Sequence, residues 1–257
     1  MIQAQRQHKI LQEIIQSGFG NIAELSKKFS ISEMTIRRDL RILESEGYVR
    51  CTRGGAIIVQ SSQVVEPLYK AKEQAHIDQK RNIARYAVEY FVSDHDVIAL
   101  EAGTTVGAMV EFFADKQHLT VVTNGLRTTN LLQQLPNITT ICTGGILRSP
   151  SSTFVGPVAE EFFRELYVNK LFLSGQGFTF NTGVTDPQMI DTQVKKAMIA
   201  AASQVVVMLD SSKFGVKSMT PVIGTKDIQY LITDVDAPAD VVSELRTAGV
   251  DVHIVNH

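Results

Sequence analysis

The chain has 257 residues, of which 44% are hydrophobic, a net charge of −2 and two cysteines. This length exceeds one typical domain and allows a sizeable buried core. The sequence has no apolar run of about 18 residues, no signal peptide and too few cysteines for a disulfide framework, so we expect a cytoplasmic protein without membrane contact. Neither Cys51 nor Cys142 has a Cys or His neighbour at metal-ligand spacing, so we expect no metal site and no cofactor.

The first 45 residues predict three amphipathic helices. A polar break at Ser30 and Ser32 separates the second helix from the third, and the Ser32 hydroxyl is a good N-cap. The apolar residues recur at helical spacing and are expected to face inward: Ile10, Leu11, Ile14 and Ile15 in the first helix, Ile22, Leu25 and Phe29 in the second, and Ile36, Leu40 and Leu43 in the third.

The third helix has a basic outer face. Its apolar stripe turns Thr35, Arg37, Arg38 and Arg41 away from the core. A helix of about 12 residues is roughly 18 Å long and fits the DNA major groove. Spacing alone leaves an alternative, an ordinary helical hairpin with a solvated basic face.

The residues after the third helix favour DNA binding over that alternative. Gly47 is expected to end the helix, and two short strands then flank the turn Thr52-Arg53-Gly54-Gly55. Such a hairpin carrying Arg50 and Arg53 is typical of the wing of a winged helix-turn-helix, where arginines lie near phosphates or the minor groove.

The charge is distributed unevenly. Residues 1–60 hold nine Lys and Arg and six Asp and Glu, a net of +3, so the remainder carries −5. A basic small domain on an acidic larger one indicates that DNA contacts are confined to one end. Because +3 is modest, one copy should bind DNA weakly, and association into a homodimer or homotetramer would multiply the phosphate contacts.

Residues 5–59 resemble the N-terminal domain of the DeoR family of bacterial transcriptional regulators. The resemblance is carried by residues 31–40, ISEMTIRRDL, together with Arg6, His8, Ile10, Leu11, Leu43, Gly47 and residues 53–56. It implies that residues early in the third helix contact bases while the arginines hold base edges or backbone. The candidate DNA-binding residues are Ser32, Met34, Thr35, Arg37, Arg38, Arg41 and Arg53.

A domain boundary is expected in the polar segment 60–66, which Pro67 closes. Residues 68–92 predict a connecting helix that buries Ile83, Ala84, Ala87, Val88 and Phe91. We therefore predict a DNA-binding domain at 1–59, a linker and connecting helix at 60–92, and an effector-binding sensor domain at 93–257.

From residue 96 the pattern alternates between strands and helices. Continuous apolar strands separated by helices predict an α/β domain with a mostly parallel sheet covered on both faces. Ligands bind such sheets outside the carboxyl ends of the strands. The predicted strands lie within residues 96–103, 118–125, 138–145, 170–177, 205–212, 230–236 and 250–256, and helices within 104–114, 125–135, 157–166 and 188–203.

Five strand ends carry small or polar residues. Glu101 and Gly103 lead to Thr104 and Thr105 at a helix start, which predicts a phosphate cradle, with a simple capping loop as the alternative. Two neighbouring ends are expected to offer amides and an Asn side chain to sugar hydroxyls; they carry Thr123-Asn124-Gly125 and Thr143-Gly144-Gly145. Another strand ends in Gly175-Gln176-Gly177, which lacks the third glycine of a dinucleotide-binding fingerprint, so we exclude that kind of site.

Two lysines and an aspartate complete the predicted site. Lys195 lies near the core edge of the helix at 188–203 and can reach a cleft, although a surface lysine is the alternative. Asp210 and Lys213 follow an apolar strand. A lysine there supplies charge to a phosphate, and an aspartate accepts hydrogen bonds from sugar hydroxyls.

The DeoR resemblance covers nearly the whole chain. In the second half it is carried by residues 103–105, 122–124, 144–145, 156, 183–185, 195–198 and 209–215. It implies a sensor domain similar in fold to ribose-5-phosphate isomerase and glucosamine-6-phosphate deaminase, with phosphorylated sugars as usual effectors. Glu101, Gly125 and Gln176 depart from the family pattern and bear on the ligand's identity. The candidate effector-binding residues are Glu101, Gly103, Thr104, Thr105, Thr123, Asn124, Gly144, Gly145, Gln176, Lys195, Asp210 and Lys213.

These features predict a DNA-binding transcriptional regulator and not an enzyme. We expect a repressor of a sugar operon that a phosphorylated sugar releases from double-stranded operator DNA. The alternative is a sugar-phosphate isomerase or deaminase with an accessory DNA-binding head, for which Glu101 or Asp210 would be the base. No histidine falls at the strand ends, which disfavours that enzyme. A purely structural DNA-binding protein would not explain five polar strand ends.

Overall fold

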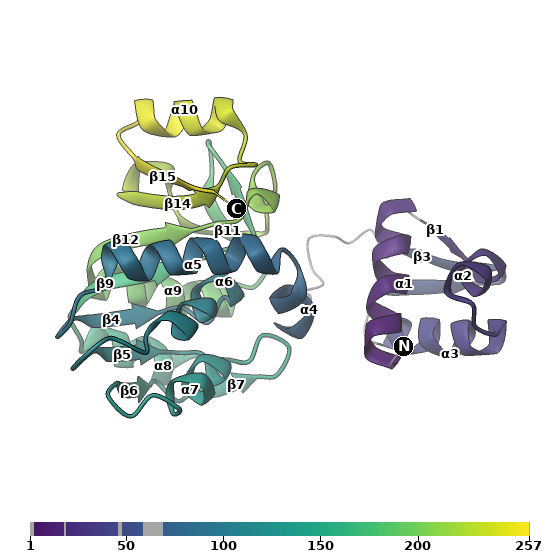
Figure 1. Ribbon diagram of the computed structural model, residues 1–257, viewed down its shortest axis with the longest axis horizontal. Coiled ribbons are helices and arrows are strands. Elements are labelled where there is room, and N and C mark those ends of the chain that lie inside the picture. Colours follow the sequence, from purple (N-terminus) through teal and green to yellow (C-terminus); the bar gives the residue numbers. More distant parts are fainter. Residues whose placement is uncertain (1–2, 18, 46–47, 59–68, 257) are drawn as a thin grey trace. The chain divides into compact units, whose positions relative to one another are not determined.

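The computed structural model describes residues 3–17, 19–45, 48–58 and 69–256 (Figure 1). The chain divides into two compact units, Met1–Val65 and Glu66–His257. The predicted helix end at Gly47, the linker segment 60–66 and Pro67 lie outside the described residues, and the predicted domain boundaries stay a prediction. None of the helices in the described ranges is long and apolar enough to cross a membrane.

The first unit is a three-helix domain with a small antiparallel sheet. Its elements are α1 (Gln3–Ser17), β1 (Phe19–Asn21), α2 (Ile22–Phe29), α3 (Glu33–Ser45), β2 (Val49–Thr52) and β3 (Gly55–Ile58). The three predicted helices are present, and their apolar stripes meet in one core that includes Ile10, Leu25, Ile36 and Leu40.

The wing is the hairpin β2–β3. Thr52 pairs with Gly55, so the turn itself is the two residues Arg53 and Gly54. A third strand that the sequence pattern did not predict, β1, pairs with β3 in the order β1-β3-β2. A Cβ at Gly55 would lie 2.0 Å from the Gly20 carbonyl oxygen, so this close pairing requires glycine.

The second unit contains a seven-stranded parallel sheet. Every strand overlaps a predicted segment, although β9 begins two residues and β12 three residues before the predicted start, so that β12 takes the last two residues of the helix expected at 188–203. The order across the sheet is β15-β14-β12-β9-β4-β5-β6. The strands are β4 (Val97–Leu100), β5 (Thr120–Thr123), β6 (Thr139–Cys142), β9 (Val168–Leu173), β12 (Ala202–Met208), β14 (Tyr230–Asp234) and β15 (Asp251–Val255).

Helices cover both faces of this sheet (Figure 1). Side chains alternate along each strand, so Leu171 and Leu173 pack on one face while Phe172 packs on the other. The helices are α4 (Tyr69–Gln74), α5 (Ile77–Phe91), α6 (Thr104–Gly107), α7 (Leu126–Leu132), α8 (Pro157–Arg164), α9 (Met189–Ala201) and α10 (Ala239–Thr247), with 3-10 helices at Ala108–Phe112, Ser211–Lys213 and Thr225–Asp227.

Several short elements were not predicted from the sequence. Besides α10, these are the strands of two small antiparallel sheets. One pairs β7 (Ile146–Arg148) with β8 (Thr153–Val155), and in the other β11 (Gly183–Asp186) pairs with both β10 (Gly177–Thr179) and β13 (Thr220–Ile223). These strands have three or four residues and lack the longer apolar runs that end in polar residues, by which the equally short β4, β5 and β6 were recognised. The helix expected at 68–92 is two helices, α4 and α5, and α5 buries Ile83, Ala84, Ala87 and Val88 within the second unit.

Strand order determines where a ligand can bind. The chain runs from β4 outward to β5 and β6, and then crosses to β9 on the other side of β4. The connections after β4 and β9 therefore diverge, which opens a crevice between the carboxyl ends of these two strands.

Candidate functional site

The outer face of α3 is open to solvent. The Thr35 amide donates to the Ser32 hydroxyl at 3.2 Å, so Ser32 is the N-cap as predicted. Met34 is 75% exposed in the first turn. Arg37, Arg38 and Arg41 are exposed further along the helix, and Arg53 is exposed at the turn of the wing.

The aspartate that follows these arginines has a structural place. Asp39 is buried and accepts hydrogen bonds from Arg6 at 2.6 and 3.1 Å and from Gln7 at 3.1 Å. This pair ties α1 to α3 and satisfies a charge that burial would otherwise penalise. In the sequence Arg37-Arg38-Asp39, the two arginines therefore face solvent and the aspartate faces the core.

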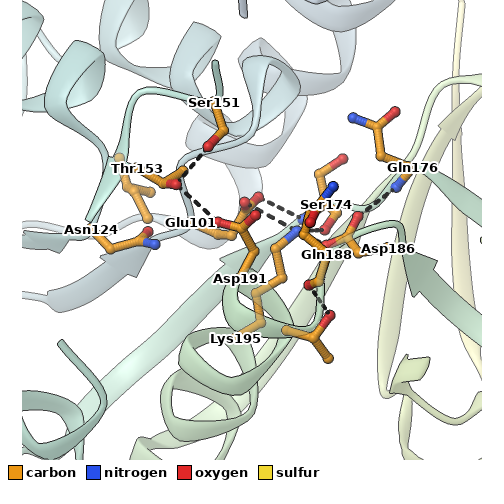
Figure 2. Close-up of polar contacts among 12 residues, drawn as sticks. Glu101, Asn124, Ser151, Thr153, Ser174, Gln176, Asp186, Gln188, Asp191 and Lys195 are labelled. Atoms are coloured by element: carbon orange, nitrogen blue, oxygen red, sulfur yellow. Dashed lines mark hydrogen bonds and ion pairs between the residues drawn. The ribbon is translucent and has the colours of Figure 1, made fainter. Parts of the chain in front are cut away.

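A polar cleft lies at the carboxyl ends of β4 and β9. Figure 2 shows its central residues, which converge from the loops after β4, β5 and β9, the hairpin β7–β8 and the helix α9. Eight of the predicted effector-binding residues line it: Glu101, Gly103, Thr104, Thr105, Asn124, Gln176, Lys195 and Lys213.

Lys195 lies at the centre of the cleft floor. Its Nζ atom is 3.1 Å from Glu101 Oε1 and 2.5 Å from Asp186 Oδ2, and it donates to the Ser174 carbonyl at 2.8 Å. With a side chain only 7% exposed, Lys195 is not the surface lysine of the alternative reading. Burial disfavours its charge, but Asp186 and Glu101 outweigh burial and hold the pKa of Lys195 above its ordinary value.

Asn124 offers the cleft an unused acceptor. Its Nδ2 donates to the Phe154 carbonyl at 3.3 Å, whereas its buried Oδ1 has no hydrogen-bond partner. A buried acceptor without a partner is costly, by about 1–3 kcal/mol. A ligand hydroxyl that donates to this oxygen would remove that cost.

The loop predicted to form a phosphate cradle leads into a short helix. Helix α6 has a single α-helical turn that begins at Thr104 and continues as a 3-10 helix. Gly103 packs directly on Glu101, because a Cβ there would lie 2.6 Å from the Glu101 carboxylate. Lys213 is half-buried and provides positive charge in the same cleft as the main-chain amides at the start of α6.

Four predicted residues do not line the cleft. Thr123 is buried, and its hydroxyl donates to Leu100 and accepts from the Gly125 amide, so it positions the loop. Gly144 and Gly145 follow β6, an edge strand two positions from β4, and their φ angles of 67° and 111° form a turn. Asp210 is fully buried and accepts from the Ser212 amide at 3.2 Å.

Sequence reasoning missed several residues of the cleft. On one wall, Asp191 pairs with Arg148 and accepts a hydrogen bond from the Thr153 hydroxyl at 2.9 Å, and Thr153 in turn contacts Ser151 at 2.7 Å. Ala102, Ser174 and Gly175 lie in predicted strand-end segments but were not chosen as candidates. The other lining residues not chosen are Lys72, Ser151, Thr153, Asp186, Pro187 and Asp191.

The described residues contain no group of three or more His, Cys, Asp or Glu side chains that could hold a metal ion. Lys72 and Lys213 supply cations at the rim, and Lys195 is neutralised by two carboxylates at the floor. The arrangement suits a ligand with an anionic group at one end and hydroxyls at the other.

Two family models match the chain. The DeoR-like helix-turn-helix domain matches residues 6–62, and the DeoR C terminal sensor domain matches residues 75–235. Together they span both compact units.

Curated relatives align over most of their length. An uncharacterized HTH-type transcriptional regulator, YulB of Bacillus subtilis, is 37% identical and covers 91% of this chain and 90% of the relative. A putative aga operon transcriptional repressor of Escherichia coli O157:H7 is 32% identical over an alignment that covers 98% of this chain and 94% of the relative. Among solved structures, ribose 5-phosphate isomerase A of Methanocaldococcus jannaschii is 19% identical over 55% of each chain, with a TM-score of 0.40.

Proposed function

The chain belongs to the DeoR family of transcriptional regulators, and we propose that it represses a carbohydrate utilisation operon until a phosphorylated sugar binds its second unit. It is a DNA-binding regulator and not an enzyme, since its curated relatives are named transcriptional regulators and repressors. The isomerase or deaminase alternative is therefore set aside.

In this proposal, α3 enters the major groove and the wing lies along the backbone. The exposed side chains of the first turn, Met34 among them, contact base edges. Arg37, Arg38 and Arg41 contact bases or phosphates, and Arg53 contacts the backbone beside the wing. Two copies of the chain would place paired helices in successive grooves of a double-stranded operator.

The cleft supports a sugar phosphate as the effector. The observation that carries this proposal is the buried Asn124 Oδ1, an acceptor without a partner in the same cleft as Lys213 and the Thr104–Gly107 turn. The cation and the helix-start amides suit a phosphate, and the free acceptor suits a sugar hydroxyl. Lys195 orders the floor between Glu101 and Asp186 and does not by itself attract an anion.

A thermal-shift screen of the full chain tests this proposal. D-ribose 5-phosphate and D-glucosamine 6-phosphate are each compared with the unphosphorylated parent sugar. A ligand present at a hundred times its Kd adds about 2.7 kcal/mol, or roughly 5–10 °C in Tm. The phosphorylated compound should stabilise the chain and weaken its binding to operator DNA. Stabilisation by the neutral sugars alone would overturn the phosphate assignment.

A further inference from the structure

We propose that Lys72 on α4 binds the anionic group of the effector, and that α4 transmits occupancy of the cleft toward the DNA-binding unit. The inference rests on the proposed effector site and adds to it a binding residue and a route of regulation. Helix α4 is the first described element of the second unit and directly follows residues 59–68 in the chain. Lys72 is half-buried and lines the cleft together with Lys213 and Thr104.

Helix α4 contacts three of the segments that shape the cleft. The Tyr69 amide donates to the Pro150 carbonyl at 2.9 Å, next to the cleft residue Ser151. The Tyr69 ring lies on α6, since a Cβ at Gly107 would be 3.0 Å from its hydroxyl oxygen. These two contacts connect α4 to the hairpin β7–β8 and to the phosphate cradle.

The third contact reaches the loop after β5. Glu73 pairs with Arg127 at 3.4 Å, and the guanidinium of Arg127 also lies 5.7 Å from the centre of the Tyr69 ring. Arg127 is in the first turn of α7, three residues after Asn124. A ligand that moves any of these three loops therefore acts on α4 as well.

A buried lysine holds the carboxyl end of α4. Lys80 on α5 is only 4% exposed, and its Nζ donates to the carbonyls of Lys72 and Ala75. Such carbonyls have no partner within a short helix, so a lysine that binds them fixes the helix end. Burial lowers the pKa of Lys80 to about 8, and the charge of Asp210 opposes this shift.

Helix α4 is short, with six residues. It is held on the second unit by hydrogen bonds to main-chain groups at its two ends, by the buried Tyr69 ring and by one partly exposed ion pair. An anion held between Lys72 and Lys213 adds an interaction that exists only when α4 is docked on the cleft. Since a ligand shifts an equilibrium only by its differential affinity, this added contact favours the docked position.

A single tryptophan can report the position of α4, because the natural chain has none. Lys70 is exposed on α4, so the Lys70→Trp variant of the full chain places the reporter there. Tyr167→Trp is the matched control. Tyr167 is 94% exposed and precedes β9, so it lies at the amino ends of the strands, away from the cleft. Both variants are titrated with sodium phosphate at constant ionic strength, and Tm is measured in parallel.

We expect phosphate to raise the Tm of both variants and to change the emission of Lys70→Trp alone. Adding Lys72→Met should abolish the emission change and weaken phosphate binding by about tenfold to a hundredfold, because a hydrogen bond to a charged group is lost while Lys213 remains. Lys72→Met keeps the main-chain carbonyl that Lys80 binds. Lys226→Met, at an exposed lysine, is the charge-matched control and should change neither readout.

The outcomes separate the two proposals. A rise in Tm with no emission change overturns the role of α4 and leaves the effector site standing. An emission change that survives Lys72→Met overturns the assignment of Lys72. If phosphate changes neither Tm nor emission, the phosphate site falls and the role of α4 falls with it.

Discussion

Replacing Lys195 by Met tests the charge arrangement at the floor of the cleft. The substitution leaves Glu101 and Asp186 buried without the cation that lies 3.1 and 2.5 Å from them. Breaking a buried ion pair by removing one partner costs about 3–5 kcal/mol. For a domain of 150–250 residues each kcal/mol shifts Tm by about 2–4 °C, so the second unit should melt roughly 10 °C lower or more.

The pH dependence of this loss follows from the direction of the pKa shift. The raised pKa of folded Lys195 means that its stabilisation is fully present below the unfolded value of about 10.4 and is lost only as pH rises through the folded value. Between pH 6 and 9 its contribution is constant. The loss of Tm in Lys195→Met should therefore stay the same from pH 6 to pH 9.

The assay is thermal unfolding of the full chain, followed by circular dichroism from pH 5 to 9. The next residue, Lys196, is exposed on the same helix, so Lys196→Met is a control that makes the same substitution at the neighbouring position. Adding Glu101→Gln and Asp186→Asn to Lys195→Met should recover much of the loss. If Lys195→Met melted within about 2 °C of Lys196→Met, the floor would not depend on this ion pair and the reasoning would be refuted.

Changing both Arg37 and Arg38 to Ala should weaken specific operator binding by about a hundredfold or more in a gel-shift titration, because each good base contact contributes about 1–3 kcal/mol, while effector-induced stabilisation persists. Gly55→Ala should destabilise the first unit by about 2 kcal/mol or more in thermal unfolding, because its Cβ would lie 2.0 Å from the Gly20 carbonyl oxygen. The pKa of Lys80, lowered to about 8, predicts that wild type gains stability relative to Lys80→Met as pH rises from 8 to 10 in thermal unfolding.

Each of these predictions has its own contradicting result. Retained operator binding in the double arginine variant, compared with an exposed pair changed in the second unit (Lys217→Ala with Lys226→Ala), would refute the role of α3. Gly54→Ala has open space around its Cβ and should be neutral, so equal loss in both glycine variants would contradict the packing argument. Parallel pH profiles for wild type and Lys80→Met would show that Lys80 titrates normally.

Local pattern was sufficient for most of the elements. The stripe of Ile36, Leu40 and Leu43 predicted α3 and its outward arginines, because helix periodicity depends only on residues a few positions apart. Each parallel strand was found in the same way, as a continuous apolar run ending in polar residues. The exposed basic face of α3 and eight residues of the cleft followed from these two patterns.

The pairing of strands far apart in the sequence determined the remaining features of the cleft. The crossing from β6 back to β9 places Ser174 beside Glu101 and leaves Gly144 and Gly145 at the sheet edge, and nothing near those glycines in sequence reveals this. Asp186, which neutralises Lys195, comes from a strand of four residues that pairs with β10 and with β13, a strand more than 30 residues further along the chain. Hydrophobic periodicity specifies which face of an element is buried, but the burial of one element against another is a property of the whole fold.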